Sequence, residues 1–406
     1  MRFIAAFTLL FYPPLFAQRT LSVEEAVSEA LARHPLLAES AARVSVSEGQ
    51  RTQAALRVNP SFTFQAENLR FGGTPPFDYG EQADTFAFLQ QRFRTAGKRD
   101  KQVAVASAGL IQSQLQRDLL SRRIGFRVKR AYWAAAAAAK QHELLRESAQ
   151  TFQQIVRFHE DRVREGAMAE LDLIRVRLEF QRLEIASNSA HLDAERLRIT
   201  LFREMGADEF PEIRFADSLE AVDRSMAAPD LAKARAERVE MQIARQTVEQ
   251  AQAGLVLQRA LAKPDVTTVF GYKRTAGLDT LLGGIQLEVP FWNRNQGQIA
   301  AGVSEVRAAE AALAATQAVV DAEVLAAHRE AQMRLRQLDE LMQPLLAEVK
   351  EASGIVREAY RTGGFDLLRL LDAERVLIEA SQMYFRLLAE YKQSLVSLDE
   401  VTGGTP

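Results

Sequence analysis

The chain has 406 residues, enough for two average domains or one long one, and carries 51 basic and 53 acidic residues. Its net charge of −2 excludes a general electrostatic attraction to nucleic acid. Because it contains no cysteine, disulfides and thiolate metal sites are also excluded.

The first 17 residues have the layout of a secretory signal peptide: Arg2, an apolar run from Phe3 to Tyr12, and a possible cleavage point after Ala17. The alternative is a membrane anchor, but this run is too short to cross about 30 Å of hydrocarbon as a helix. No other stretch has 18 uninterrupted apolar residues, so we expect no transmembrane helix in the mature chain. Without cysteine, the mature N-terminus cannot be lipid-modified on a thiol.

The rest of the chain, residues 18–406, is predicted to be one domain made of two repeats, about 21–206 and 228–403. The two sequences align at a lag near 200 residues, so that NPSFTFQAE at 59–67 recurs as KPDVTTVFGY at 263–272. Each repeat has the predicted order helix, strand, strand, long helix, tight turn, helix.

Four strands of about ten residues are predicted, at about 60–69, 84–93, 265–274 and 281–291. Apolar and polar residues alternate along them, which gives each strand one apolar and one polar face. The residues expected to face lipid are Phe62, Phe64, Ile285 and Leu287. Those expected to face a lumen are Gln65, Gln286 and Glu288. This length fits tilted membrane strands; the alternative is a pair of ordinary surface hairpins.

Apolar residues recur at every seventh position in three series, which predicts coiled-coil packing. The series are Leu171, Leu178, Ile185, Leu192 and Ile199; Ile299, Val306, Leu313 and Val320; and Leu371, Ile378 and Phe385. The stretch 298–360, whose one proline is Pro344, would be about 95 Å long as a continuous helix. Glycine turns at 165–170 and 362–367 predict that each long helix reverses into an antiparallel partner. The fold class is mainly α with a small membrane β part.

Four membrane strands cannot close a pore alone, because single-chain bacterial barrels start at eight strands and an open edge in lipid leaves backbone groups unpaired. Either the strands are not in a membrane, or several chains share one barrel. Three copies would supply twelve strands and would bring their helices together as a tube. Phe291 and Trp292, at the join of strand and helix, suit a membrane–water interface.

Three motifs carry a family resemblance: LSVEEAVSEALARHP at 21–35, PFWNRNQGQI at 290–299 and AYRTGGFDLLRLLDAERVLIEA at 359–380. Over about 21–403, the sequence resembles the trimeric outer-membrane efflux channels called outer-membrane factors, or TolC-like proteins. PFWNRNQG is most similar to the cobalt-zinc-cadmium branch, which serves heavy-metal exporters. The resemblance implies a homotrimeric, passive α-barrel and β-barrel duct in the outer membrane of a Gram-negative bacterium, with its helical part in the periplasm. It also implies a periplasmic adaptor and an inner-membrane pump of the resistance-nodulation-division type as partners.

The resemblance further implies a gate at the periplasmic end, where Asp372 aligns with one acidic gate position. Arg369 occupies the family's other acidic position, which is a departure. Three interpretations remain open: a salt-bridged lock of arginine and aspartate rings, an outward-facing Arg369, or a solvated face for both residues. The exposed hairpin tips are the expected adaptor contact: Arg164, Gly166, Arg361, Gly363 and Gly364.

The sequence contains no nucleophile elbow, phosphate loop or dinucleotide fingerprint, so we expect neither enzymatic activity nor a cofactor. The histidines are scattered at positions 34, 142, 159, 191 and 328, and no metal site is expected. The alternative functions are a periplasmic coiled-coil adaptor or scaffold, a secreted enzyme, and a TolC-like channel for drugs or type I protein secretion. An adaptor would not explain four membrane-length strands.

Overall fold

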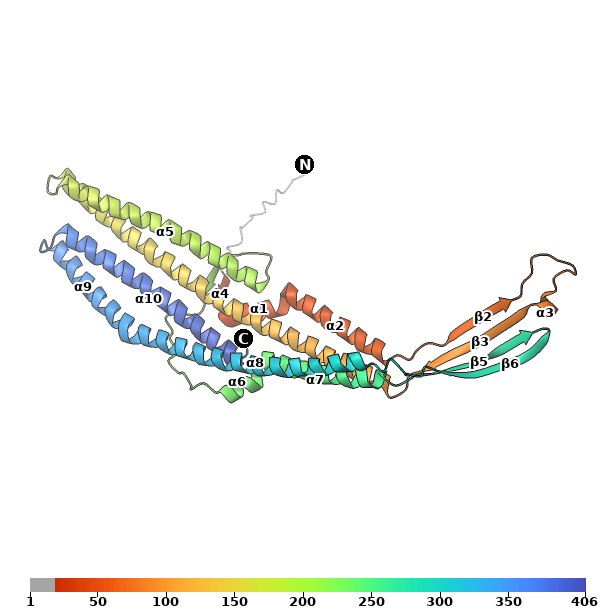
Figure 1. Cartoon of the computed structure of the whole chain (residues 1–406). Helices are drawn as coiled ribbons and strands as arrows, with labels where there is room; N and C mark the ends of the chain where they lie inside the picture. Colours follow the sequence, from red (N-terminus) through yellow and green to blue (C-terminus); the bar gives the residue numbers. More distant parts are fainter. Residues whose placement is uncertain (1–18) are drawn as a thin grey trace, which may run out of the picture.

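The computed structural model describes residues 19–406. The predicted signal peptide, residues 1–17, lies outside the described residues. The molecule is long: four strands form one end, two helical hairpins form the other, and shorter helices lie between them (Figure 1). The expected mainly α fold with a small β part is therefore confirmed.

The first half of the chain runs from β1 to β4. Its elements are β1 (Arg19–Leu21), α1 (Val23–Arg33), α2 (Pro35–Ala55), β2 (Ser61–Glu67), α3 (Tyr79–Gln82), β3 (Asp84–Phe93), α4 (Lys98–Arg164), α5 (Glu170–Met205) and β4 (Ile213–Phe215). The second half runs from α6 to α10. Its elements are α6 (Leu231–Glu237), α7 (Val239–Leu261), β5 (Val266–Thr275), β6 (Leu278–Leu287), α8 (Gln296–Arg336), the π-helical segment η1 (Gln337–Met342), α9 (Gln343–Arg361) and α10 (Leu367–Thr402).

The four longer strands form one antiparallel sheet in the order β2-β3-β5-β6. β5 and β6 are joined by Ala276 and Gly277, whose φ angles are both positive, at 52° and 77°. A two-residue turn of this kind matches the twist of its flanking strands and so determines the hairpin register. As a result, β6 runs from Leu278 to Leu287 instead of over the expected 281–291. Glu288, expected within this strand, lies beyond its end.

The stretch expected to be one long helix continues from Gln296 to Arg361, but its middle is π-helical. Pro344 lies just after this segment, in the first turn of α9. Proline has no N–H to donate, and its ring clashes with the preceding turn, so the helix must adjust locally. The wider π-helical turns provide that adjustment and let the helix continue to the tip.

The long helices lie side by side in the order α5, α4, α10 and α8–α9 (Figure 1). α4 contacts both α5 and α10, while α8 and α9 contact α10. α5 and α8–α9 are therefore the two edges of the helical layer. α4, with 67 residues, is about 100 Å long.

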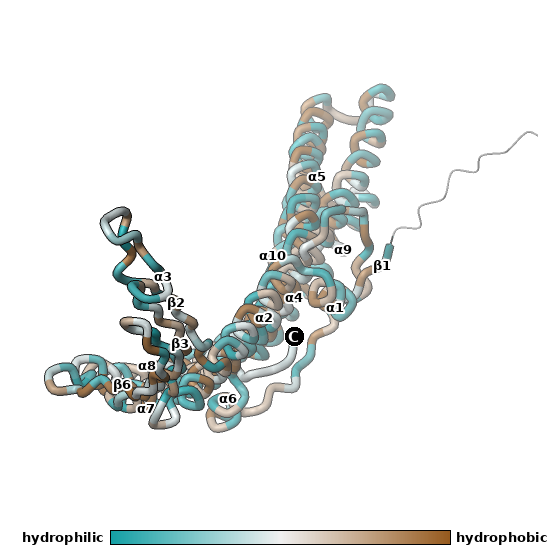
Figure 2. The backbone as a smooth tube through the Cα atoms, turned by 90° about the vertical axis from the view of Figure 1, so that its right-hand side faces the viewer, coloured by the Kyte–Doolittle hydropathy of each residue, from teal (hydrophilic) through white to brown (hydrophobic). Residues whose placement is uncertain are grey.

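Hydrophobic and hydrophilic residues are interspersed along the long helices (Figure 2). Among residues 19–406, no helix is both long and apolar enough to cross a membrane. The largest hydrophobic core lies in the middle of the molecule and includes Tyr132 of α4 and Tyr391 of α10, both fully buried. The Tyr132 hydroxyl lies 3.0 Å from the Leu21 carbonyl oxygen and 2.9 Å from Asp217 Oδ2, which ties the β1–β4 region to α4.

Two of the three heptad series pack within the chain, as Val320 of α8 and Ile378 of α10 show by their burial. The third series, on α5, is exposed. Its members are Leu171, Leu178, Ile185, Leu192 and Ile199, with exposed fractions of 44–68%. α5 instead packs on α4 through residues such as Leu173, Val176 and Leu183. The spacing of seven thus indicates an apolar seam but not the helix that it meets.

Candidate functional site

The sheet register places the four residues expected to face lipid on one face. Phe62 of β2 pairs with Leu89 of β3, which pairs with Phe270 of β5. Phe270 in turn pairs with Gly283 of β6. Directly paired residues share a face, and so does every second residue along each strand. This face therefore carries Phe62, Phe64, Ile285 and Leu287, whose exposed fractions are 51–71%.

The opposite face carries Gln65 and Gln286, the two expected lumen residues that lie within strands. Gly271 pairs with Phe88 on this face, and a Cβ at Gly271 would lie only 2.4 Å from the Phe88 Cα atom. Glycine is therefore needed for the two strands to pair this closely. Because Glu288 follows the end of β6, the register assigns it to neither face.

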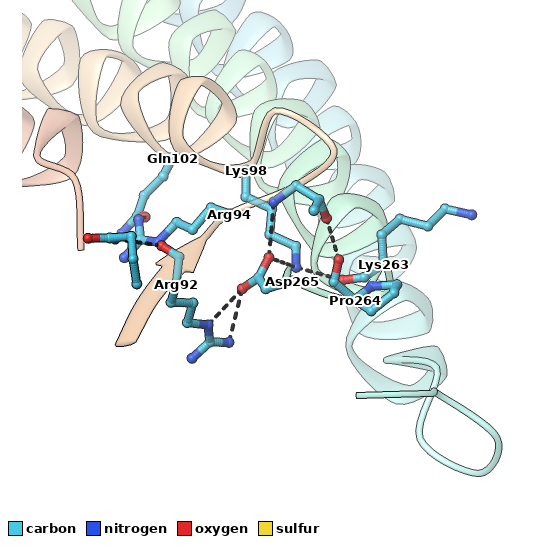
Figure 3. A network of polar contacts seen from close by, with 9 residues as sticks. Arg92, Arg94, Lys98, Gln102, Lys263, Pro264 and Asp265 are labelled. Atoms are coloured by element: carbon cyan, nitrogen blue, oxygen red, sulfur yellow. Dashed lines mark hydrogen bonds and ion pairs between the residues drawn. The ribbon is translucent and has the colours of Figure 1, made fainter. Parts of the chain in front are cut away.

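A network built around a buried ion pair joins the strands to the long helices (Figure 3). Asp265, just before β5, accepts a hydrogen bond from Nζ of Lys98, at the start of α4, over 2.6 Å. Their side chains are only 9% and 7% exposed. Asp265 also accepts from Arg92 Nε at 3.0 Å and from the backbone N–H of Thr95 at 3.1 Å. Lys98 Nζ donates to the carbonyl of Lys263 at 2.6 Å. The network therefore connects β3, α4 and β5.

The Asp265 carboxyl is held in its charged form. Burial raises its pKa, but the hydrogen bonds from Lys98 and Thr95 and the charge of Lys98 outweigh that effect and hold the pKa below its ordinary value. The predicted order of elements contains a strand-to-helix join in each repeat, but it does not predict the ion pair. Because Lys98 and Asp265 are 167 residues apart, no local pattern signals their contact.

The five candidate tip residues lie at the α4–α5 and α9–α10 turns. These turns form the end of the molecule opposite the sheet (Figure 1). Gly166 and Gly363 have φ angles of 70° and 80°, in the left-handed region that glycine adopts without strain. Gly364 follows directly. Arg164 and Arg361 each form a salt bridge with an acidic residue three positions earlier, at 3.1 Å and 3.2 Å. The tips are thus compact turns with charged, exposed flanks.

A buried hydrogen bond joins the two hairpins near these tips. His159 of α4 is fully buried, and its Nε2 lies 2.8 Å from the hydroxyl of Tyr360 of α9. Its Nδ1 lies 2.8 Å from the carbonyl of Ile155, so a neutral imidazole would donate there and accept from the tyrosine. Burial, and then the charge of Asp172, raises the pKa of Tyr360 and keeps its hydroxyl protonated. The histidines are scattered in the sequence, and no local pattern around His159 indicates this contact.

The two candidate gate residues are exposed and engage other partners in this chain. Asp372 Oδ1 lies 3.2 Å from Arg375, one turn further along α10. The Arg369 guanidinium lies over the Phe365 ring, 4.9 Å from its centroid. Both side chains are exposed on the surface of this chain.

In the described part of the chain, no group of three or more metal-ligating side chains comes together. The structure does bring His142 of α4 beside His191 of α5, with ring centroids 4.9 Å apart. Two imidazoles are fewer than the three or four protein ligands of ordinary zinc sites.

Both edges of the helical layer carry exposed apolar side chains. On α5 they are the heptad series described above. On α8, η1 and α9 they include Val319, Met333, Leu341, Leu345 and Ile355, with exposed fractions of 44–69%. Extended apolar stripes of this kind are typical of surfaces that bind another chain.

Comparison with known proteins agrees with this architecture. A family model described as outer membrane efflux protein matches residues 26–207 and 231–404. The chain is 23% identical over 395 residues to the cobalt-zinc-cadmium resistance protein CzcC of Cupriavidus metallidurans, covering 96% of this chain and 92% of that protein.

Two solved structures have the same fold. The open state of the MtrE outer membrane channel of Neisseria gonorrhoeae matches with a TM-score of 0.78 and 17% identity, over 94% of this chain and 89% of that one. The outer membrane protein VceC of Vibrio cholerae matches with a TM-score of 0.74 and 18% identity, over 94% and 96% of the two chains.

Proposed function

This chain belongs to the outer membrane efflux protein family, and from that premise we propose that it is the passive outer-membrane duct of a tripartite efflux system. The observation that carries the proposal is a sheet with one largely apolar face joined directly to helices about 100 Å long (Figure 1). The sheet would lie in the outer membrane, and the helices would extend through the periplasm toward an inner-membrane pump.

The duct is a homotrimer in this proposal. β2 and β6 are open sheet edges, and their unpaired N–H and C=O groups would be costly in lipid. Pairing β6 of one chain with β2 of the next would close a twelve-stranded barrel from three chains. The same head-to-tail contact would bring the apolar edge of α5 against that of α8–α9 of the next chain. One neighbouring chain would thus pair the open strand edge of the sheet and also cover the apolar edge of the helical layer. The two halves of the chain would act as repeats within this ring.

The face with Phe62, Phe64, Ile285 and Leu287 would contact lipid, because hydrocarbon solvates their apolar side chains. Gln65 and Gln286 would face the lumen, and Glu288 would lie at its periplasmic rim.

A periplasmic adaptor would bind the hairpin tips, whose contact residues are Arg164, Gly166, Arg361, Gly363 and Gly364. An inner-membrane pump of the resistance-nodulation-division type would supply the substrate. Asp372 and Arg369, exposed near the tips, would line the narrow periplasmic end of the trimer. Signal-peptide export would bring the chain to the outer membrane.

Heavy-metal cations are the proposed cargo. The support is the similarity to CzcC over nearly the full length of both chains, together with the motif PFWNRNQG. The passive duct needs no tight metal site, because a tightly bound ion would leave slowly. A channel for drugs or for type I protein secretion would share this fold, so the cargo is tested separately.

The test expresses the chain with a matching adaptor and pump in a Gram-negative host lacking its own channel. We expect a trimer in the outer-membrane fraction, and lower cell-associated zinc, cobalt and cadmium than in cells without the channel. A protein that fractionates as a monomer outside the membrane would refute the duct. A membrane trimer that lowers none of the three metals would refute the cargo alone.

A further inference from the structure

The connections between strands and helices, together with the adjoining ends of β3, α4, α7 and α8, form a basic collar, which we define as residues 56–60, 92–101, 259–265 and 288–296. The collar contains nine basic and three acidic residues, although the whole chain is slightly acidic. The basic residues are Arg57, Arg92, Arg94, Lys98, Arg99, Lys101, Arg259, Lys263 and Arg294. Positive charge is therefore concentrated at the level where the sheet ends.

Most of this charge is not neutralised within the chain. Asp265 is engaged by Lys98 and Arg92, and Asp100 lies 3.4 Å from Arg99. No salt bridge within residues 19–406 joins the other six basic residues of the collar to a carboxylate. Figure 3 shows the Lys263 side chain extending away from the Asp265 network, while its backbone carbonyl takes part in it.

Two cavities lie in the collar, and the Lys98–Asp265 pair lines both of them. One, of about 430 Å³, is lined by Lys263, Glu288, Phe291 and Trp292 as well as by the ion pair. The other, of about 350 Å³, is lined by Arg94 and by the aliphatic Leu257 and Leu261. Each cavity thus combines cationic side chains with apolar ones. Trp292 is 89% exposed and Phe291 is 67% exposed.

We propose that the basic collar binds the headgroups of anionic phospholipids in the leaflet of the outer membrane that faces the periplasm. The inference rests on the proposed function, because it requires the sheet to lie in lipid. The collar then lies at headgroup level, where Lys263 in one cavity and Arg94 in the other each donate to a lipid phosphate. Phe291 and Trp292 lie against the upper part of the acyl chains, in the manner of an interfacial aromatic belt.

A phospholipid fits this surface better than a free anion does. Inorganic phosphate would satisfy the cations but would leave Phe291, Trp292 and Leu261 exposed to water. A lipid satisfies both, because its phosphate and its acyl chains are covalently joined. Clusters of basic residues beside a membrane-spanning segment attract anionic lipids.

The experiment measures lipid binding to the detergent-purified full-length trimer by native mass spectrometry, with cardiolipin, phosphatidylglycerol and phosphatidylethanolamine as probes. The test variant is Arg94→Gln with Lys263→Gln. The matched control is Lys350→Gln with Arg386→Gln, which removes the same charge from two exposed positions on α9 and α10 that have no salt bridge in the described chain. Trimer yield is recorded for each protein. The single variant Lys263→Gln is also measured, because the Lys263 side chain forms no hydrogen bond or salt bridge in the Asp265 network.

We expect the wild type and the control to prefer the two anionic lipids. The double variant should bind them about 25-fold more weakly, at roughly fivefold for each basic residue lost. Binding should weaken with added salt and should withstand competition from inorganic phosphate. Equal binding of all three lipids by the wild type, an equal loss in the control, or displacement by phosphate would overturn the proposal. A trimer that inserts in membranes without lipid preference refutes the collar only, whereas a chain that does not insert refutes the duct itself.

Discussion

Replacing Asp265 with asparagine tests whether the buried network holds the strands to the helices. The substitution preserves size but removes the negative charge 2.6 Å from Lys98 Nζ, whose side chain is 7% exposed. Leaving one partner of a buried pair without its counter-charge costs about 3–5 kcal/mol. With an unfolding entropy near 2 cal/mol/K per residue, that cost lowers the melting temperature by roughly 4–6 °C.

The assay is thermal unfolding of the detergent-solubilised trimer, followed by circular dichroism. Asp100→Asn is the matched control, because Asp100 is 77% exposed and pairs with Arg99 at 3.4 Å. An exposed pair of this kind contributes about 0–1 kcal/mol. The double variant Lys98→Met with Asp265→Leu replaces both charges by apolar groups and should recover part of the lost stability, since the Thr95 N–H and the Lys263 carbonyl still lose their side-chain partners. Melting of Asp265→Asn within about 1 °C of the control would refute the reasoning.

The same network has a defined pH dependence. Because the pKa of Asp265 is lowered in the folded chain, its stabilising effect is fully present above the ordinary value of 3.8. The effect is lost as the pH falls through the lower, folded-state pKa. The gap in melting temperature between the wild type and Asp265→Asn should therefore persist at neutral pH and shrink only in strongly acidic buffer.

Ile285→Arg should reduce the yield of membrane-embedded trimer more than Gln286→Arg, because arginine at the mid-membrane lipid face costs about 2–4 kcal/mol. Equal yields would mean that the sheet lies outside lipid or that its faces are reversed. Gly363→Val forces a β-branched residue to a φ of 80° at the tip, at a cost of about 1–3 kcal/mol. Efflux and adaptor crosslinking should fall, while the yield of trimer should stay unchanged. A collapse in trimer yield would mean that the glycine is needed for folding. Asp372→Ala should weaken cation selectivity and cation block in single-channel recordings with little change in melting temperature, since its pair with Arg375 is exposed. Unchanged recordings would place Asp372 outside the pore.

Local pattern was enough to predict the kinds of element and much of their order. Alternation around Phe62 and Ile285 indicates strands with two different faces, since side chains on a strand point alternately to opposite sides. The glycines at 166 and 363 indicate the ends of long helices, since they adopt the left-handed turn at little cost. Each of these signals depends on neighbours within a few residues, so it can be read from the sequence alone.

The tertiary structure decided what lies opposite each face. The turn at Ala276 and Gly277 shifts β6 so that Glu288 falls beyond it, and the heptad series of α5 faces outward although its spacing equals that of the buried series. The bond between His159 and Tyr360 spans 201 residues of sequence. The spacing of apolar residues along the sequence predicts whether a side chain lies on an apolar or a polar face. Only the packing of distant segments determines which partner it meets, because that choice depends on contacts whose sequence separation leaves no local trace.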